Sequence, residues 1–293
     1  MIGWCFSDHY STENSMSPHE RLSEGTAITA VGSGPAVLLA HGAGGGIDAN
    51  FGPVLRSLAA AHRTLGVDYP GSGLVPPSTG PLTLDALADR LVGAADDEGI
   101  EEFAVAGFSL GGPVAIRVCA RYPERVKAVI LTATFARADA RLRLAAKIWS
   151  ELYATGDRRL LAEFLTLVAF SDEALEAAGL SVLRESVDAL AGAIAPGTRE
   201  QLTLLQQTDV RADAAQIAAP TLVLVTSRDP LVSISTQRSL HAMIPGARIK
   251  ELNSGHLPFA ELPDQWSSEV LAFLEFVGWS DARDRAAAQA DER

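Results

Sequence analysis

The segment GFSLG at residues 107–111 places Ser109 between two glycines, each two positions away. Before it, residues 103–106 form a short apolar run, and after it residues 110–121 have a helical period. A sharp strand-to-helix turn brings neighbouring backbone close together, so only small residues fit on either side of the serine. The segment therefore predicts a strained turn that presents a serine at the end of a strand, as a nucleophile requires.

Uninterrupted apolar runs recur along the chain and alternate with segments of helical period. Such runs are typical of strands that are covered on both faces. Their alternation with helices favours an α/β fold with a doubly wound, mostly parallel central sheet flanked by helices. The predicted strands are 26–31, 36–40, 64–67, 103–106, 126–131, 221–225 and 248–252. The predicted helices are 50–61, 82–98 with Thr83 as its cap, 110–121 and 264–276.

The pattern changes between the two halves of this predicted sheet. Residues 135–212 are rich in Ala and Leu and show helical stretches at 140–155, 158–170, 172–190 and 198–207. We expect them to form an inserted helical cap on a core made of residues 21–134 and 213–278. A polar leader (1–20) and a charged tail (279–293) flank the core, and both are expected to fray.

Size and charge restrict the class of protein. A chain of 293 residues with 47% hydrophobic residues suits one large α/β domain with an insertion. The net charge of −12 creates a field that repels nucleic acid and anionic membranes, so neither partner is expected. The cysteines Cys5 and Cys119 cannot build a disulfide framework or a paired-cysteine metal site. Without a signal peptide or a long apolar run, we expect a cytoplasmic protein, and a homo-oligomer is left open.

The glycine-rich segment HGAGGG at residues 41–46 follows the predicted strand 36–40. Glycines let main-chain amides point at a ligand, and the helix start at Leu110 offers a further amide to a developing negative charge. The order of strand, HGAGGG, DYPGSG at 68–73 and then GFSLG resembles the α/β-hydrolase superfamily, in its serine esterase or lactonase-like branch, over residues 32–277. By this resemblance the Ala43 amide completes an oxyanion hole with Leu110, and the Gly44 amide is the second choice.

A serine hydroxyl becomes a good nucleophile only when a base, normally histidine, takes its proton and a carboxylate orients that base. In the superfamily the order is serine, acid, histidine. The resemblance therefore implies Asp229, after the strand 221–225, as the acid, and His256, after the strand 248–252, as the base. Asp139 is the alternative acid, because some members take the carboxylate from the region after the preceding strand.

The remaining histidines and Asp68 have structural interpretations. His9 and His19 lie in the leader, His62 and His241 lie in predicted helices, the first of them on the surface, and His41 belongs to the glycine-rich segment. Asp68 is expected to cap its own turn through hydrogen bonds from its side chain to the backbone.

A helical lid over the predicted serine turn would supply the apolar walls of a ligand site. Aromatic and aliphatic residues at helical spacing in the cap are more often core residues, yet several could line such a site. They are Trp149, Tyr153, Phe164, Leu167 and Phe170. The residues predicted to contact substrate are Gly44, Phe108, Trp149, Tyr153 and Phe170.

These features predict a serine hydrolase that cleaves a small to medium, largely apolar carboxylic ester, thioester or lactone through an acyl-enzyme. The expected partner is a small-molecule substrate, and the chemistry requires neither a metal nor an organic cofactor. Two alternatives stay open, because one fold hosts many activities. One is a non-hydrolytic enzyme, such as a carbon–carbon bond cleaving enzyme, lyase, cyclase or epimerase, and the other is a non-catalytic binder of small ligands.

Overall fold

The computed structural model describes residues 22–23 and 26–280, so the predicted leader and residues 281–293 of the predicted tail lie outside the described residues. Within this part of the chain, eight strands form one sheet in the order β1-β2-β4-β3-β5-β6-β7-β8. Neighbouring strands from β4 to β8 are parallel, whereas β2 is antiparallel to both β1 and β4. The bounds are β1 Leu22–Ser23, β2 Thr26–Val31, β3 Ala36–Ala40, β4 Arg63–Val67, β5 Phe103–Phe108, β6 Val126–Thr132, β7 Thr221–Thr226 and β8 Arg248–Leu252. The predicted, mostly parallel sheet is confirmed.

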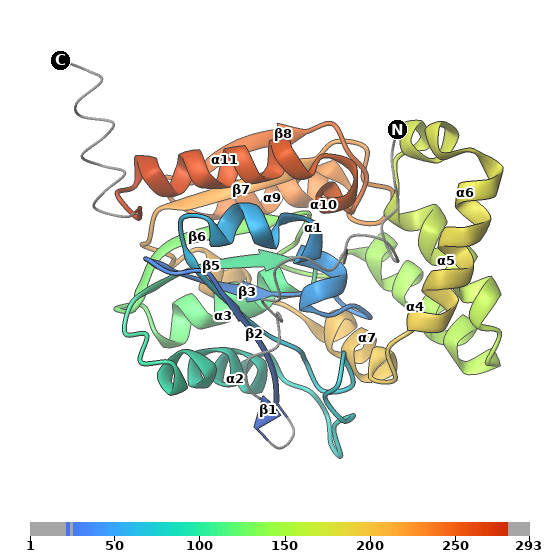
Figure 1. Ribbon diagram of the computed structural model, residues 1–293, viewed down its shortest axis with the longest axis horizontal. Coiled ribbons are helices and arrows are strands. Elements are labelled where there is room, and N and C mark those ends of the chain that lie inside the picture. The colour runs from blue at the N-terminus through green and yellow to red at the C-terminus, as the bar shows by residue number, and fades with distance from the viewer. Residues whose placement is uncertain (1–21, 24–25, 281–293) are drawn as a thin grey trace, which may run out of the picture.

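Helices cover both faces of the sheet. One face packs against α1 (Ile47–Ala59), α10 (Pro258–Glu261) and α11 (Pro263–Phe276). The other packs against α2 (Leu84–Asp97), α3 (Gly111–Arg121), α8 (Arg211–Ala214) and α9 (Ile234–Met243). In Figure 1, α1 and α11 lie above the sheet and α2 and α3 lie below it.

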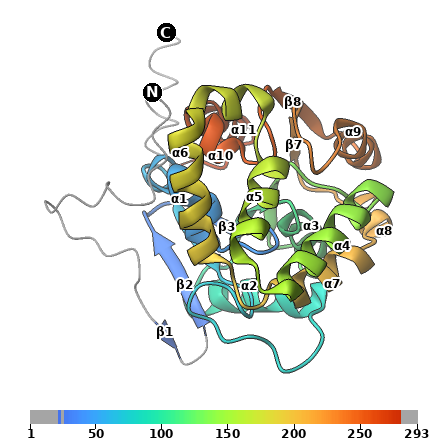
Figure 2. The same ribbon diagram turned by 90° about the vertical axis from the view of Figure 1, so that its right-hand side faces the viewer.

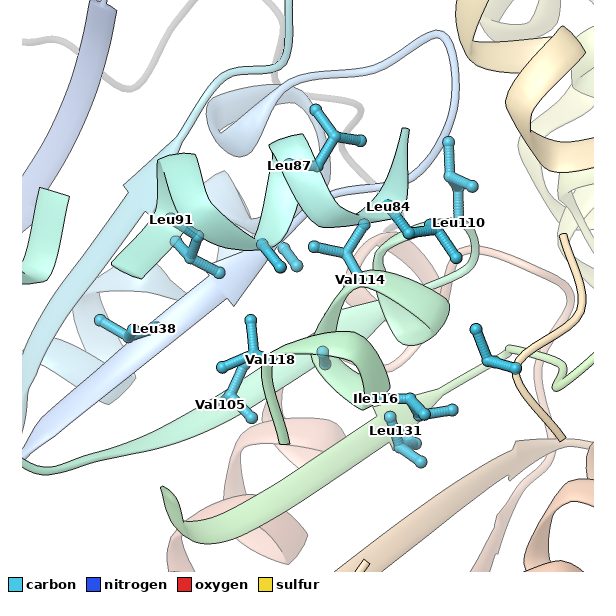
Figure 3. Packing of buried hydrophobic residues seen from close by; sticks show 14 of the residues in the cluster. Leu38, Leu84, Leu87, Leu91, Val105, Leu110, Val114, Ile116, Val118 and Leu131 are labelled. Carbon is cyan, nitrogen blue, oxygen red and sulfur yellow. The ribbon is translucent and has the colours of Figure 1, made fainter. Parts of the chain in front are cut away.

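The helix α2 shows how the apolar period of the sequence builds this core. Leu84, Leu87 and Leu91 recur at intervals of three and four residues and are all buried. In Figure 3 they lie over Val114 of α3 and Leu38 of β3. Each buried side chain of this size stabilises the fold by about 1.5–3 kcal/mol relative to exposure. The predicted cap Thr83 is confirmed, because its hydroxyl accepts a hydrogen bond from the Ala86 amide.

A group of helices connects β6 to β7 and lies beyond one end of the sheet; Figure 2 looks directly onto it. We call residues 140–207 the helical insertion. Its helices are α4 (Ala140–Thr155), α5 (Arg158–Ala169), α6 (Asp172–Ala193) and α7 (Thr198–Gln207). Side chains cap the first three at their N-termini: Asp139, Asp157 and Ser171 accept from backbone amides three residues later. Gly179 leaves helical geometry at φ 73°, so α6, which covers the predicted helical stretch 172–190, is broken by a kink.

Three local predictions around the first helix are wrong. This helix begins at Ile47, not at residue 50, because the Asp68 carboxylate accepts the Ile47 amide at 2.8 Å and so stabilises an earlier start. Asp68 therefore caps α1 and not its own turn. His62 is not on a surface helix: it follows α1, is buried, and its Nε2 bonds the Trp279 carbonyl at 3.0 Å.

Among the described residues, no helix has the length and apolar character needed to cross a membrane. Cys119 lies in α3 and is buried, as predicted, and burial raises the pKa of its thiol to about 12. A thiol of this kind is inert as a nucleophile at neutral pH.

Candidate active site

Ser109 occupies the tight turn between β5 and α3. Its backbone is left-handed, with φ 51°, a conformation that residues other than glycine rarely adopt. A Cβ added to Gly107 would lie 2.3 Å from the Gly111 carbonyl oxygen, and one added to Gly111 would lie 1.9 Å from the Ala40 carbonyl oxygen. Both flanking glycines are therefore required by close backbone contacts, as the sequence predicts.

The structure brings Ser109, His256 and Asp229 into one hydrogen-bonded chain. His256 Nδ1 lies 2.8 Å from Asp229 Oδ2, and His256 Nε2 lies 3.0 Å from Ser109 Oγ. The three side chains come from the carboxyl ends of β5, β7 and β8. With Nδ1–H donating to the carboxylate, Nε2 is free to accept the serine proton. Ser109 and His256 are each only 5% exposed, so this chain is shielded from water.

The Asp229 carboxylate is held in place by donors from β7, from the loop that carries it and from α9. Its Oδ1 accepts the amides of Leu231 and Val232, both at 2.8 Å. Its Oδ2 accepts from Thr226 Oγ1 at 2.9 Å and from Gln237 Nε2 at 3.2 Å, in addition to His256. These donors fix the direction in which the carboxylate faces the imidazole.

Asp139, the alternative acid, has a different position. It caps α4 through the Leu142 amide, and its second oxygen accepts from Thr236 Oγ1. Both oxygens are thus engaged with partners other than His256. The geometry favours Asp229 as the residue that orients the histidine.

The glycine-rich segment runs beside the serine turn. A Cβ on Gly42 would lie 3.2 Å from Ser109 Cβ. The Gly42 amide donates to Asn50 Oδ1 at 2.9 Å, and the Gly44 amide donates to Gln201 Oε1 at 2.8 Å. Within residues 26–280, the Ala43 and Leu110 amides have no hydrogen-bond acceptor. The two amides predicted for an oxyanion hole are therefore unengaged, whereas the Gly44 amide, the second choice, is occupied.

His41 shapes this segment and takes no part in the hydrogen-bonded chain. Its Nδ1 donates to the Gly42 carbonyl at 2.8 Å, and its Nε2 accepts the Tyr69 amide at 2.9 Å. Its ring stacks on Tyr69 with centroids 3.7 Å apart. Burial lowers the pKa of His41 to about 4, so the ring is neutral at pH 7.

Of the residues predicted to contact substrate, some lie beside the glycine-rich segment or His256, and Tyr153 lies elsewhere. Trp149 packs on the glycine-rich segment, where a Cβ on Gly44 would lie 2.5 Å from the Trp149 Cζ2 atom. The Phe108 ring lies 5.0 Å from the His256 ring, and the Phe170 backbone packs against the glycine before His256. Tyr153 instead donates to the Pro196 carbonyl and lines a separate hollow within the helical insertion. Of the other cap residues named from the sequence, Leu167 is exposed.

Sequence reasoning missed Gln201 and Glu261, which join the helical insertion to the loops around the site. Glu261 Oε1 accepts the amides of Ser171 and Gly255, and Oε2 accepts from Ser171 Oγ at 2.6 Å. No motif marks either residue. The period of α7 offers one signal, because Gln201 shares a buried face with Thr198 and Leu205.

The sequence pattern of the family described as alpha/beta hydrolase fold matches residues 35–263. The chain belongs to this α/β-hydrolase fold family. The resemblance, the fold class and the assignment as an α/β hydrolase are thereby confirmed.

Individual relatives of this hydrolase agree with that membership. It is 31% identical to the pyrrolizixenacetamide deacetylase of Xenorhabdus hominickii over 245 residues, which covers 83% of this chain and 92% of the relative. It is also 31% identical to the pimeloyl-[acyl-carrier protein] methyl ester esterase of Nitrosomonas europaea over 257 residues, covering 82% and 96%. The crystal structure of the enol-lactonase from Burkholderia xenovorans LB400 superimposes with a TM-score of 0.77 at 24% identity, covering 86% of this chain and 98% of that one.

Proposed function

We propose that this α/β hydrolase cleaves a small to medium, largely apolar carboxylic ester, thioester or lactone through an acyl-enzyme on Ser109. The observation that carries the proposal is the continuous hydrogen-bonded chain from Ser109 Oγ through His256 to Asp229. A serine in a strained turn, next to the His256 imidazole and two unengaged amides, has the parts that acyl transfer requires.

In the first half of the reaction, Ser109 Oγ attacks the acyl carbon while His256 Nε2 takes the hydroxyl proton. Asp229 stabilises the imidazolium that forms and holds its tautomer. The amides of Leu110 and Ala43 donate to the oxygen of the tetrahedral intermediate, where negative charge develops. His256 then gives its proton to the leaving alcohol or thiol, and the acyl group stays on the serine.

In the second half, water enters the place of the leaving group. His256 takes a proton from this water, which attacks the acyl carbon and forms a second tetrahedral intermediate on the same two amides. Its collapse releases the carboxylic acid and returns the proton to Ser109. Every step uses side chains and amides of the described chain.

The walls of the site and the names of the relatives support the proposed substrate class. Phe108 and Trp149 place aromatic surface beside the histidine and the glycine-rich segment. Such surface favours an apolar group next to the acyl carbon. One relative is named a deacetylase and another a methyl ester esterase, and both names support chemistry at an acyl group.

Intact-mass labelling with a fluorophosphonate tests this proposal. The wild-type protein should gain one adduct, because the reagent reacts with an activated serine. Ser109→Ala and His256→Ala should each lose it while keeping a normal circular dichroism spectrum, since neither change removes a core contact of the sheet. Hydrolysis of p-nitrophenyl esters should fall by about 10³-fold or more in both variants.

A folded wild-type protein without an adduct would contradict the proposal and favour a ligand-binding protein or a non-hydrolytic enzyme. If the adduct forms, reaction in ¹⁸O-labelled water separates hydrolysis from isomerisation and cyclisation. Hydrolysis incorporates solvent oxygen into the acid product, whereas an isomerisation or cyclisation does not.

A further inference from the structure

Gln201 lies in α7 of the helical insertion, yet its side chain reaches into the α/β core. It is fully buried. Its Oε1 accepts the Gly44 amide at 2.8 Å, and its Nε2 donates to Ser72 Oγ at 2.9 Å and to the Pro70 carbonyl at 3.2 Å. Because the donors and the acceptor of the amide group face different partners, only one orientation of this group satisfies all three bonds.

The start of α7 is fixed against the core, which sets the position of Gln201. The Gly197 amide donates to the Gly71 carbonyl at 3.0 Å. Gly71 has φ 81°, and a Cβ there would lie 2.2 Å from Gly197 Cα. The segment DYPGSG at 68–73 therefore packs against the N-terminus of α7. Gln201 lies one helical turn after Gly197.

Gln201 is one of two side chains that hold the glycine-rich segment on either side of Ala43. Asn50, in α1 of the core, accepts the Gly42 amide, and Gln201 accepts the Gly44 amide. The Ala43 amide between them has no acceptor within residues 26–280. Two neighbours that are held in this way restrict the direction in which the middle amide points.

We propose that Gln201 is a positioning residue, which holds Gly44 so that the Ala43 amide faces the oxygen of the tetrahedral intermediate. The inference rests on the proposed function. It makes the helical insertion a source of transition-state stabilisation, acting through a main-chain amide of the core. Donors that are fixed before the reaction stabilise developing charge more than donors that must reorient.

The first test replaces Gln201 by methionine, which has a similar volume and none of the three hydrogen bonds. Hydrolysis of p-nitrophenyl acetate should show kcat lowered about 10–100-fold and KM changed less than about 3-fold, because the lost interaction acts in the transition state. Leu202→Met is the matched control: this neighbour in α7 is equally buried and bonds no catalytic loop. It should leave kcat within about 2-fold of the wild type.

A second variant keeps the test decisive if Gln201→Met folds poorly. In Gln201→Glu, a neutral carboxylic acid can still accept the Gly44 amide and donate to Ser72. An ionised carboxylate would oppose both the Pro70 carbonyl and the charge on the intermediate. The ratio of variant to wild-type kcat should therefore rise as pH falls from about 8 to about 6, whereas the ratio for Gln201→Met should stay constant.

Fluorophosphonate labelling separates failure of this inference from failure of the proposed function. A wild-type protein that takes no label would overturn both. A labelled wild-type protein whose kcat is matched by Gln201→Met, or a pH-independent ratio for Gln201→Glu, would overturn the positioning role alone.

Discussion

The α/β core and the helical insertion differ in how tightly they hold their side chains. In the core, the Asp229 carboxylate is fully buried with five hydrogen-bond donors, and both ring nitrogens of His41 are paired. The insertion exposes large apolar side chains, with Leu167 at 62% and Leu180 at 75%, and α6 is broken at Gly179. The groups proposed for the chemistry thus belong to the part of the molecule with the denser network.

The insertion contacts the loops around the candidate site through a few buried groups. Trp149 and Gln201 meet the glycine-rich segment at Gly44, and Ser171 is linked through Glu261 to the loop that carries His256. A substitution in the insertion can therefore alter the proposed reaction through these groups, although the insertion itself supplies no reacting atom. The difference teaches that the helical insertion touches the candidate site at a few points, while the core holds Ser109, His256 and Asp229 in one hydrogen-bonded chain.

The largest expected effect compares the two candidate acids, Asp229 in the loop after β7 and Asp139 at the start of α4. Asp229→Asn should lower kcat for p-nitrophenyl acetate by about 10³–10⁴-fold, because the amide cannot hold the required tautomer of His256. Asp139→Asn should leave kcat within about 3-fold of the wild type, because asparagine caps α4 as well as aspartate does. Equal losses in both variants would show that the acid has been assigned to the wrong residue.

A smaller effect is expected on the pH dependence of stability, because His41 is buried in the core. Its pKa is 6.5 in the unfolded chain and about 4 in the fold, so the unfolded state binds more protons between these values. The free energy of unfolding should therefore fall as pH drops from 6.5 to about 4, by up to about 3 kcal/mol from this residue.

Urea unfolding of the wild type and His41→Gln over this pH range measures that contribution. The variant lacks the titrating ring, so its stability should depend less steeply on pH. Parallel curves for the two proteins would mean that the ring takes up protons in the fold as readily as in the unfolded chain.

The smallest effect concerns the link between the two regions. Glu261→Ala should cost about 2 kcal/mol of stability, because it leaves the amides of Ser171 and Gly255 without their acceptor. Hydrogen exchange should rise at these two amides more than in β5. Leu180→Gln, on the exposed face of the insertion, should change stability by less than about 0.5 kcal/mol and serves as the control. An equal loss of stability in both variants would contradict the view that the hydrogen bonds of Glu261 stabilise the contact between the insertion and the core.

Much of the site could be predicted because its requirements are local. The tight turn at Ser109 permits only small residues two positions away, so the chain itself displays the motif. Asp229 follows the apolar strand β7 and His256 follows β8, and parallel strands bring such ends to one edge of the sheet. Asp68 and His62 were misplaced because each bonds a partner distant in the chain: Ile47 for Asp68, and Trp279 for His62.

The sequence by itself determined the α/β pattern, the serine turn, and the order of the residue types that follow it. These depend on periodicity and on steric limits within a few residues. Only the tertiary structure decided that Asp229, and not Asp139, meets the histidine, and that Gln201 and Glu261 reach the loops around the candidate site. Hydrogen bonds between residues far apart in the chain depend on how the helices pack on the sheet, and no local pattern records that packing.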